Sequence, residues 1–144
     1  MATQQLLDFA ANHYLLVGGF ILVLSLLIQD IISGGSGKDT VDPSGATELI
    51  NNEEALVIDV RPAADFNKAH IINARNIPMS GFAGQIDSLR KYQERPLILS
   101  CNSGAQSASA CRILRKAGFS RVFNLRGGIL AWQNANFPVS RKRK

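Results

Sequence analysis

Two hydrophobic patterns divide the chain near residue 33. Residues 15–28 form an almost uninterrupted apolar run without charged side chains. Beyond residue 40, short apolar runs alternate with segments whose apolar positions recur at helical spacing. The first pattern predicts one long apolar helix, and the second predicts strands alternating with helices.

The apolar run is typical of a membrane-spanning helix. Its fourteen residues would give about 21 Å of helix, short of a hydrocarbon core of about 30 Å. A helix extended over residues 9–32 would close this gap. A signal peptide would begin with basic residues, which residues 1–32 lack, and a core helix would show polar positions at helical spacing. We therefore expect residues 1–32 to be a lead and one transmembrane anchor.

The basic residues predict how the anchor is oriented. Lys and Arg total 16, all after residue 32, against 9 acidic residues in the same part, and the net charge is +5. The positive-inside rule then predicts the inner membrane, with the C-terminal part in the cytoplasm. Residues 33–42 are rich in Gly and Ser and predict a flexible linker. We expect the basic tail, residues 140–144, to lie on anionic lipid and not to bind nucleic acid, because it lacks interleaved aromatic residues.

Residues 43–139 are predicted to form one α/β domain. The apolar runs predict strands over residues 55–60, 74–77, 96–100 and 122–124. Helical spacing predicts helices over residues 43–52 (with Ser44 as N-cap), 64–68, 82–92, 108–117 and 129–134. Alternating strands and helices with short connections indicate a mostly parallel sheet with helices on both faces.

The candidate chemistry lies between the strand over residues 96–100 and the helix that follows it. Cys101 begins this loop, and Gly104 and its small neighbours let backbone N–H groups converge as a nest. The start of the next helix adds a partial positive charge, so a thiolate would be stabilised. Cys101 is therefore the candidate nucleophile. The candidate anion-binding residues are Asn102, Ser103, Gly104, Ala105, Gln106 and Ser107.

Other chemistries fit this sequence less well. Cys-dependent phosphatases need an Arg six residues after the nucleophile to clamp phosphate, and that position is Ser107. Cys111 falls on the apolar face of the predicted helix and is expected in the core, too far from Cys101 for a disulfide. The two cysteines do not form a metal site with a His partner, and we expect neither metal nor cofactor.

With these residues in place, the chain resembles the rhodanese (sulfurtransferase) family over residues 43–139. Six segments carry the resemblance, in the family's order and at its spacings. They are Asp59-Val60-Arg61, Asp65-Phe66 with His70-Ile71, Ala74-Arg75-Asn76-Ile77-Pro78, Cys101-x-x-Gly104-x-x-Ser107, Ala117-Gly118-Phe119, and Leu125-x-Gly127-Gly128 with Trp132.

The resemblance implies a persulfide cycle. Cys101 would take a sulfane sulfur from a donor such as thiosulfate and pass it to a thiol acceptor. Asp59, Arg61 and Arg126 are candidates for bracing the loop or lining its pocket. The chain departs from the family's usual Gly at Ala69 and Asn73, and has neutral Gln106 where many members have Arg, Thr or Ser.

Two other functions remain open at this level. The domain could be a non-catalytic interaction module, tethered to the membrane and binding a membrane-protein partner. It could also be a thiol redox sensor, which would form a sulfenic acid at Cys101 instead of a persulfide.

Overall fold

The computed structural model describes residues 2–33 and 39–141. The chain divides into two compact units near residue 36, and each is described by itself. Residues 34–38 of the expected linker and residues 142–144 of the basic tail lie outside the described part.

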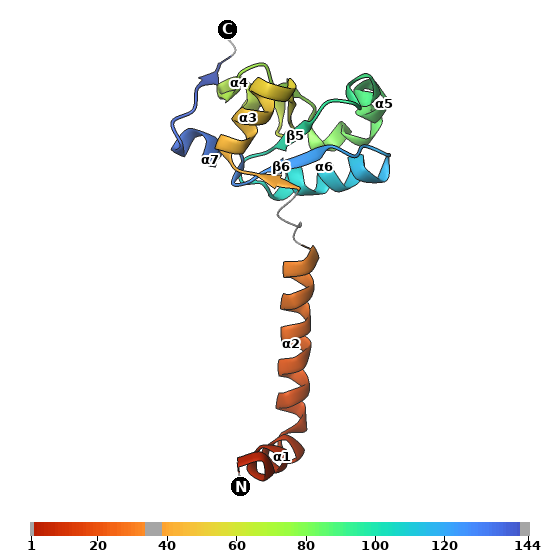
Figure 1. The fold of residues 1–144 in the computed structure, drawn as a ribbon, viewed down its shortest axis with the longest axis vertical. Helices are drawn as coiled ribbons and strands as arrows, with labels where there is room; N and C mark the ends of the chain where they lie inside the picture. The colour runs from red at the N-terminus through yellow and green to blue at the C-terminus, as the bar shows by residue number, and fades with distance from the viewer. Residues whose placement is uncertain (1, 34–38, 142–144) are drawn as a thin grey trace. The chain divides into compact units, whose positions relative to one another are not determined.

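The N-terminal unit consists of two helices, α1 (Ala2–Asn12) and α2 (Tyr14–Ser33). They meet at His13, and the bend between them is 94° (Figure 1). The continuous helix expected over residues 9–32 is therefore wrong. Asn12 and His13 are both weaker helix formers than the Leu and Ala around them, which favours a break here. Over the described residues, no helix taken singly has the length and apolar character of a bilayer span, whereas this bent pair together has both.

Five parallel strands form the central sheet of the second unit, in the order β1-β6-β5-β2-β4. Their bounds are β1 Thr40–Val41, β2 Leu56–Asp59, β4 Arg75–Asn76, β5 Leu97–Ser100 and β6 Val122–Leu125. A separate antiparallel pair joins β3 (His70–Ile71) to β7 (Val139–Ser140). The predicted parallel sheet is confirmed, and β5 lies at its centre, buried along its whole length.

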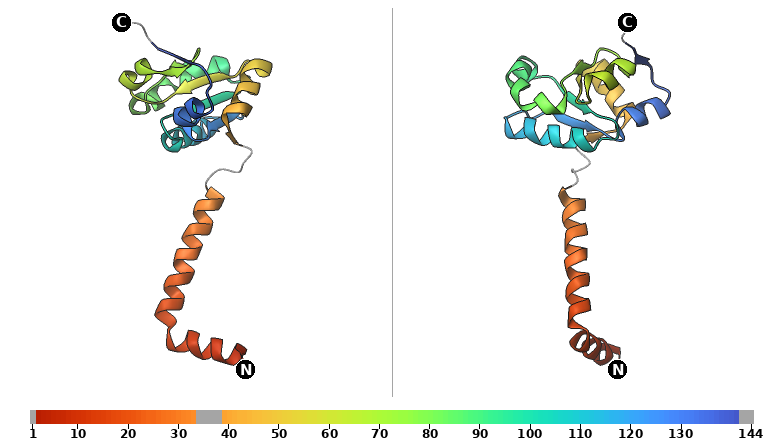
Figure 2. Two further views of the ribbon diagram at one scale, coloured as in Figure 1. Left: turned by 90° about the vertical axis from the view of Figure 1, so that its left-hand side faces the viewer. Right: turned by 180° about the vertical axis from the view of Figure 1, so that it is seen from behind.

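Helices cover both faces of this sheet, as predicted (Figures 1 and 2). One core joins the sheet to α6 (Ala105–Lys116), α5 (Ile86–Leu89) and the neighbouring short helices, through side chains such as Ile58, Leu89 and Leu114. The other core joins it to α3 (Pro43–Glu53) and α7 (Gly128–Asn134), through Ala46, Ile129 and Trp132. The remaining elements are α4 (Ala63–Lys68) and the 3-10 turns η1 (Met79–Gly81), η2 (Ala83–Gln85) and η3 (Arg90–Tyr92).

The domain begins earlier than the sequence indicated. Thr40–Val41, which we expected in the linker, form the edge strand β1 beside β6. Asp42 caps α3, because its Oδ1 accepts a hydrogen bond of 2.8 Å from the Gly45 N–H. The predicted cap, Ser44, is wrong: Pro43 already occupies the first turn, where its missing N–H costs nothing.

Three further expectations need correction. The segment 82–92 is not one helix but the short α5 between η2 and η3. The helix α6 starts at Ala105 and not at residue 108, so the Cys101 loop is shorter than expected. Ser140, placed in the basic tail, pairs with His70 in the antiparallel ladder.

Candidate active site

Cys101 lies at the carboxyl end of the central strand β5. In an open parallel sheet, this edge is where ligand sites form, because the loops after neighbouring strands converge there. The segments that follow β2, β4 and β6 surround it, beginning at Val60, Ile77 and Arg126. Cys101 is only 2% exposed, so its sulfur lies beneath the loop that follows it.

Two donors contact the Cys101 sulfur. The Gly104 N–H donates to Sγ over 3.0 Å, and the Ser107 hydroxyl lies 3.4 Å from Sγ. Gly104 is the N-cap of α6 and has a φ of +98°, a conformation that a side chain would strain. The loop therefore turns its amides inward at the start of a twelve-residue helix, which favours negative charge on the sulfur.

Opposing effects set the pKa of the Cys101 thiol. Burial raises this pKa, because a thiolate loses solvation inside the protein. Hydrogen bonds from the Ser107 hydroxyl and from the backbone of Ser107, Gly104 and Ser103 lower it. These hydrogen bonds prevail, and the pKa lies below its ordinary value. The thiolate that sulfur chemistry requires is thus favoured by main-chain and hydroxyl donors, without a basic side chain.

Asn124 on β6 belongs to the same network, and our sequence reasoning missed it. Its Oδ1 lies 2.6 Å from the Ser107 Oγ, and its Nδ2 donates to the Gly104 carbonyl over 3.1 Å. A polar amide within the otherwise apolar strand 122–125 was the available signal. Strand periodicity alone could not say that this amide reaches a loop twenty residues away.

The segment Gly127–Leu130 holds the loop from its other side. The Ile129 N–H donates to the Cys101 carbonyl over 2.9 Å, and the Leu130 N–H donates to the Asn102 carbonyl over 3.3 Å. The approach is so close that a Cβ on Gly128 would lie 2.4 Å from the Cys101 carbonyl oxygen. The paired glycines of the sequence motif thus allow backbone-to-backbone contact with the loop.

The other predicted site residues divide into two groups. Asp59 and Arg61 form a buried ion pair with an Nη2–Oδ2 distance of 2.6 Å, and Arg61 also donates to the Ala69 carbonyl over 2.7 Å. They brace the turn after β2. Arg126 is exposed, and its backbone N–H donates to the Val41 carbonyl. Asn102, Ser103, Ala105 and Gln106 are exposed on the loop surface.

Two clefts flank the loop and meet at Pro62 and Gln106, which line both. The first, of about 500 Å³, is lined mostly by polar and charged residues. Its remaining lining residues are Arg61, Asp65, Lys68, Ala69, Asn102, Ile129 and Gln133. The second, of about 410 Å³, is mostly apolar. Its remaining lining residues are Val60, Ala63, Pro78, Met79 and Ser80. A substrate that reaches the loop would therefore meet Gln106 from either side.

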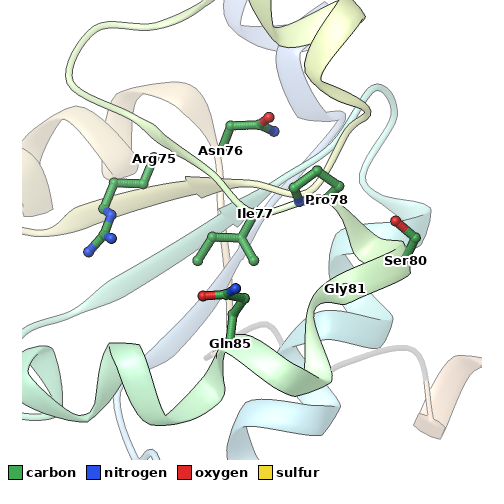
Figure 3. A pocket seen from close by; sticks show the side chains of 7 residues that line it. All are labelled: Arg75, Asn76, Ile77, Pro78, Ser80, Gly81 and Gln85. Carbon is green, nitrogen blue, oxygen red and sulfur yellow. The ribbon is translucent and has the colours of Figure 1, made fainter.

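A third pocket of about 290 Å³ lies beside β4 (Figure 3). Residues 75–78, Ser80, Gly81 and Gln85 line it, and the Ile77 and Gln85 side chains face each other across it. Arg75, its one cationic side chain, donates to the Tyr92 hydroxyl over 3.1 Å. This pocket has no cysteine among its lining residues, so the Cys101 loop stays the candidate active site.

The second cysteine is chemically different from Cys101. Cys111 lies in the core on α6, as expected, and burial raises the pKa of its thiol to about 12. We expect iodoacetamide at pH 7 to alkylate Cys101 and to leave Cys111 unmodified in the folded protein, because the pKa of the Cys101 thiol lies below its ordinary value and that of Cys111 far above. Peptide mass spectrometry measures both sites, and denatured protein alkylated at pH 8.5 is the control for full labelling. Equal labelling of both cysteines in folded protein would contradict the pKa difference.

An α/β sheet with a cysteine loop between its central strand and a helix N-terminus, clamped by a Gly-Gly segment, is the rhodanese type of domain. The rhodanese-like domain model matches residues 42–135, more than half of the chain. The protein therefore belongs to the rhodanese-like family.

Individual relatives agree with this assignment. The chain is 33% identical over 140 residues to the uncharacterized protein YibN of Escherichia coli (strain K12), covering 96% of this chain and 98% of that one. It is 35% identical over 91 residues to a protein of Allochromatium vinosum named sulfurtransferase, covering 63% and 83%. The crystal structure of a rhodanese-related protein from Thermoplasma volcanium superposes with a TM-score of 0.65 at 25% identity, covering 72% and 98%.

Proposed function

We propose that this protein is a sulfurtransferase that carries a sulfane sulfur as a persulfide on Cys101. The observation that supports the proposal best is the Gly104 N–H, which donates to Sγ over 3.0 Å at the start of α6, with the Ser107 hydroxyl within reach of the same sulfur. Such donors hold an anionic sulfur as they would hold another small anion.

The reaction needs no external oxidant or reductant. The Cys101 thiolate attacks the outer sulfur of a donor R–S–SH, the new Sγ–S bond forms, and the donor's S–S bond breaks with R–S⁻ as the leaving group. A thiolate acceptor R′–S⁻ then attacks the outer sulfur of the Cys101 persulfide. This step forms R′–S–SH and returns Cys101 to the thiolate.

The clefts favour a persulfide donor over thiosulfate. Thiosulfate is a dianion and would bind best beside an unpaired cation. Among the described residues that line the two clefts, the cations are Arg61 and Lys68, and both pair with carboxylates, those of Asp59 and Asp65. Gln106, which lines both clefts, is neutral. We therefore infer that the donor is the persulfide of a thiol compound or of a protein.

Introducing a charge at Gln106 tests whether the sulfur donor is a persulfide or thiosulfate. We expect Gln106→Arg to raise kcat/KM for thiosulfate about threefold, since an ionic contact at an exposed site contributes about 0.7 kcal/mol. Steady-state kinetics with thiosulfate and a thiol acceptor measures the change. Gln106→Glu should lower the same constant, and Gln85→Arg, beside β4, should leave it unchanged. Brisk wild-type turnover at low thiosulfate would contradict the inference.

Sulfur loading tests the enzymatic proposal itself. Purified protein treated with a small-molecule persulfide, then freed of excess donor, should gain about 32 Da, the mass of one sulfur atom, on the peptide that contains Cys101. A gain of 16 Da instead would indicate a sulfenic acid and the redox-sensor function. No gain with persulfide or thiosulfate would contradict transferase activity.

We propose further that the α1–α2 pair anchors the protein in the inner membrane, with the domain in the cytoplasm. Almost all large exposed apolar side chains belong to these two helices, from Leu6 to Ile28, and the domain adds only Ile72 and Leu130 among its described residues. Large exposed apolar surfaces of this kind mark membrane or protein contacts. The absence of Lys and Arg before residue 33 supports the orientation.

Flotation with lipid vesicles checks the anchor. We expect the full chain to float with the vesicles and to resist extraction by alkaline carbonate. Leu22→Asp combined with Leu26→Asp should leave most of the protein in the dense fraction, because each buried charge costs about 3 kcal/mol in the bilayer. Ile72→Asp places the same charge on an exposed apolar residue of the domain and should still float. Carbonate extraction of the wild-type chain would contradict the anchor.

A further inference from the structure

The Ser107 hydroxyl has two acceptors and only one proton. Its Oγ lies 2.6 Å from Asn124 Oδ1 and 3.4 Å from Cys101 Sγ. A serine hydroxyl donates one hydrogen bond at a time. Ser107 must therefore donate either to the amide oxygen or to the sulfur, and the shorter distance favours the amide oxygen in this structure.

The Asn124 amide cannot easily turn away from this contact. Its Nδ2 donates to the Gly104 carbonyl, so a flipped amide would bring two acceptor oxygens together. The residue also sits in a strand paired on both sides, opposite Thr40 of β1 and Leu99 of β5. Its backbone N–H donates to the Asp39 carbonyl over 2.9 Å. The amide hydrogen bond and the paired backbone thus both keep Oδ1 facing Ser107.

We propose that Asn124 is a positioning residue that competes with the Cys101 sulfur for the Ser107 proton and so favours the sulfur-loaded loop over the empty one. The second half of this inference rests on the proposed persulfide function. In the empty state the charge is on Sγ, and Ser107 stabilises it only by leaving Asn124. In the loaded state the charge moves to the outer sulfur and Sγ becomes a neutral, weak acceptor. Ser107 can then donate to Asn124 without depriving a charged sulfur of a hydrogen bond.

In the described part of the chain, the other charged groups near the loop are paired or distant from the sulfur. In the cleft beside the loop, Asp65 and Lys68 of α4 pair with each other over 3.2 Å. Among the described residues, β5, β6 and α7 have no charged side chain. At the end of β2, Asp59 and Arg61 neutralise each other. On α6, Cys111 is protonated at neutral pH, and the basic residues are confined to its second half, from Arg112 onward.

The competition predicts opposite effects for the two partners. Ser107→Ala removes the donor that the thiolate shares with Asn124, so the pH midpoint of Cys101 alkylation should rise by about 0.5 pH unit, as expected for losing one weak hydrogen bond. Asn124→Ala frees Ser107 for the sulfur, so the midpoint should fall by about the same amount. If Asn124 only stiffened the loop, its removal would loosen the amide donors and raise the midpoint. The direction of the change therefore separates the two roles.

The experiment measures iodoacetamide rates at Cys101 from pH 5 to 9, by peptide mass spectrometry on the full chain in detergent. The variants are Asn124→Ala, Ser107→Ala and the double variant. The double variant should have the midpoint of Ser107→Ala, because the hydroxyl for which Asn124 and the sulfur compete is absent from both. Asn124→Val is the second test at this position: it suits a strand, lacks an acceptor and should also lower the midpoint. A rise in both Asn124 variants, or a double variant with a midpoint lower than that of Ser107→Ala, would overturn the proposal.

Sulfur loading forms the second arm. At equal concentrations of persulfide donor and its thiol, Asn124→Ala should hold about threefold less persulfide than the wild type. In the Ser107→Ala background, the same substitution at Asn124 should leave the amount of persulfide unchanged. Alkylation does not depend on sulfur transfer. A wild type that takes up no sulfur while the midpoints move as expected would remove the enzyme proposal and retain the proton competition. If the wild type loads normally and the alkylation midpoints of the variants do not move, the enzyme proposal is retained and the proton competition is overturned.

Discussion

Cys101→Ser is expected to abolish sulfur loading and to lower sulfurtransferase turnover by at least about 1,000-fold. A serine oxygen at this position would meet the same Gly104 and Ser107 donors. It would nevertheless remain protonated at neutral pH, whereas the pKa of the Cys101 thiol lies below its ordinary value. The substitution therefore removes the nucleophile with little change in shape. Intact-mass measurement after treatment with a persulfide donor should show no added sulfur.

Cys111→Ala provides the matched control for this result. Cys111 is buried on α6, behind the loop, and is protonated at neutral pH. Its replacement should leave loading at one sulfur per chain, with a modest loss of stability from the small cavity. Loading that persists in Cys101→Ser and disappears in Cys111→Ala would show that Cys111, and not Cys101, carries the sulfur. If neither variant nor the wild type loads, the interaction module becomes the better function for this domain.

Gly128→Ala is expected to destabilise the domain by about 3 kcal/mol or more, because a left-handed backbone and a steric clash act together. Gly128 has a φ of +58°, and an added Cβ would lie 2.4 Å from the Cys101 carbonyl oxygen and 2.6 Å from that of Asn102. Neither contact is with a flexible side chain, so the loop backbone itself must move. Urea denaturation followed by circular dichroism measures the loss. Sulfur loading of the folded Gly128→Ala variant, measured without urea, should fall as well.

Gly118→Ala separates the two causes of this loss. Gly118 has a similarly positive φ of +97°, but an added Cβ would meet nothing within 4 Å. We expect it to cost only about 1–2 kcal/mol, the strain of the left-handed conformation, and to load sulfur normally. Equal destabilisation by the two substitutions would show that the contact between Gly128 and the loop contributes nothing.

Much of the fold followed from continuous apolar runs. The strands at 56–59 and 97–100 are buried along most of their length, and that at 122–125 is at least half-buried, so most of their side chains are apolar without alternation and the strands could be located directly. The edge strand β1 has only two residues, too short for any periodicity to appear. The segment 82–92 kept helical spacing, yet its turns are split between 3-10 and α geometry. Spacing alone does not distinguish these geometries over so few residues.

The N-terminal helices illustrate the same limit. A window of hydropathy is insensitive to the direction of the backbone, so the expected span over residues 9–32 showed no sign of the 94° bend at His13. The apolar character of α2 was nevertheless evident from composition.

For the site, local sequence was sufficient to choose Cys101 and its loop, because a thiol between an apolar strand and a glycine-containing turn implies inward-facing amides. Which groups meet that loop from other elements was decided only by tertiary structure. Asn124, Ile129 and Leu130 reach it from beyond α6, and the pairing of β5 with β6 brings them there. Short-range sequence encodes the nucleophile because its donors are its own neighbours, whereas the proton balance around it depends on contacts between distant segments that no local pattern records.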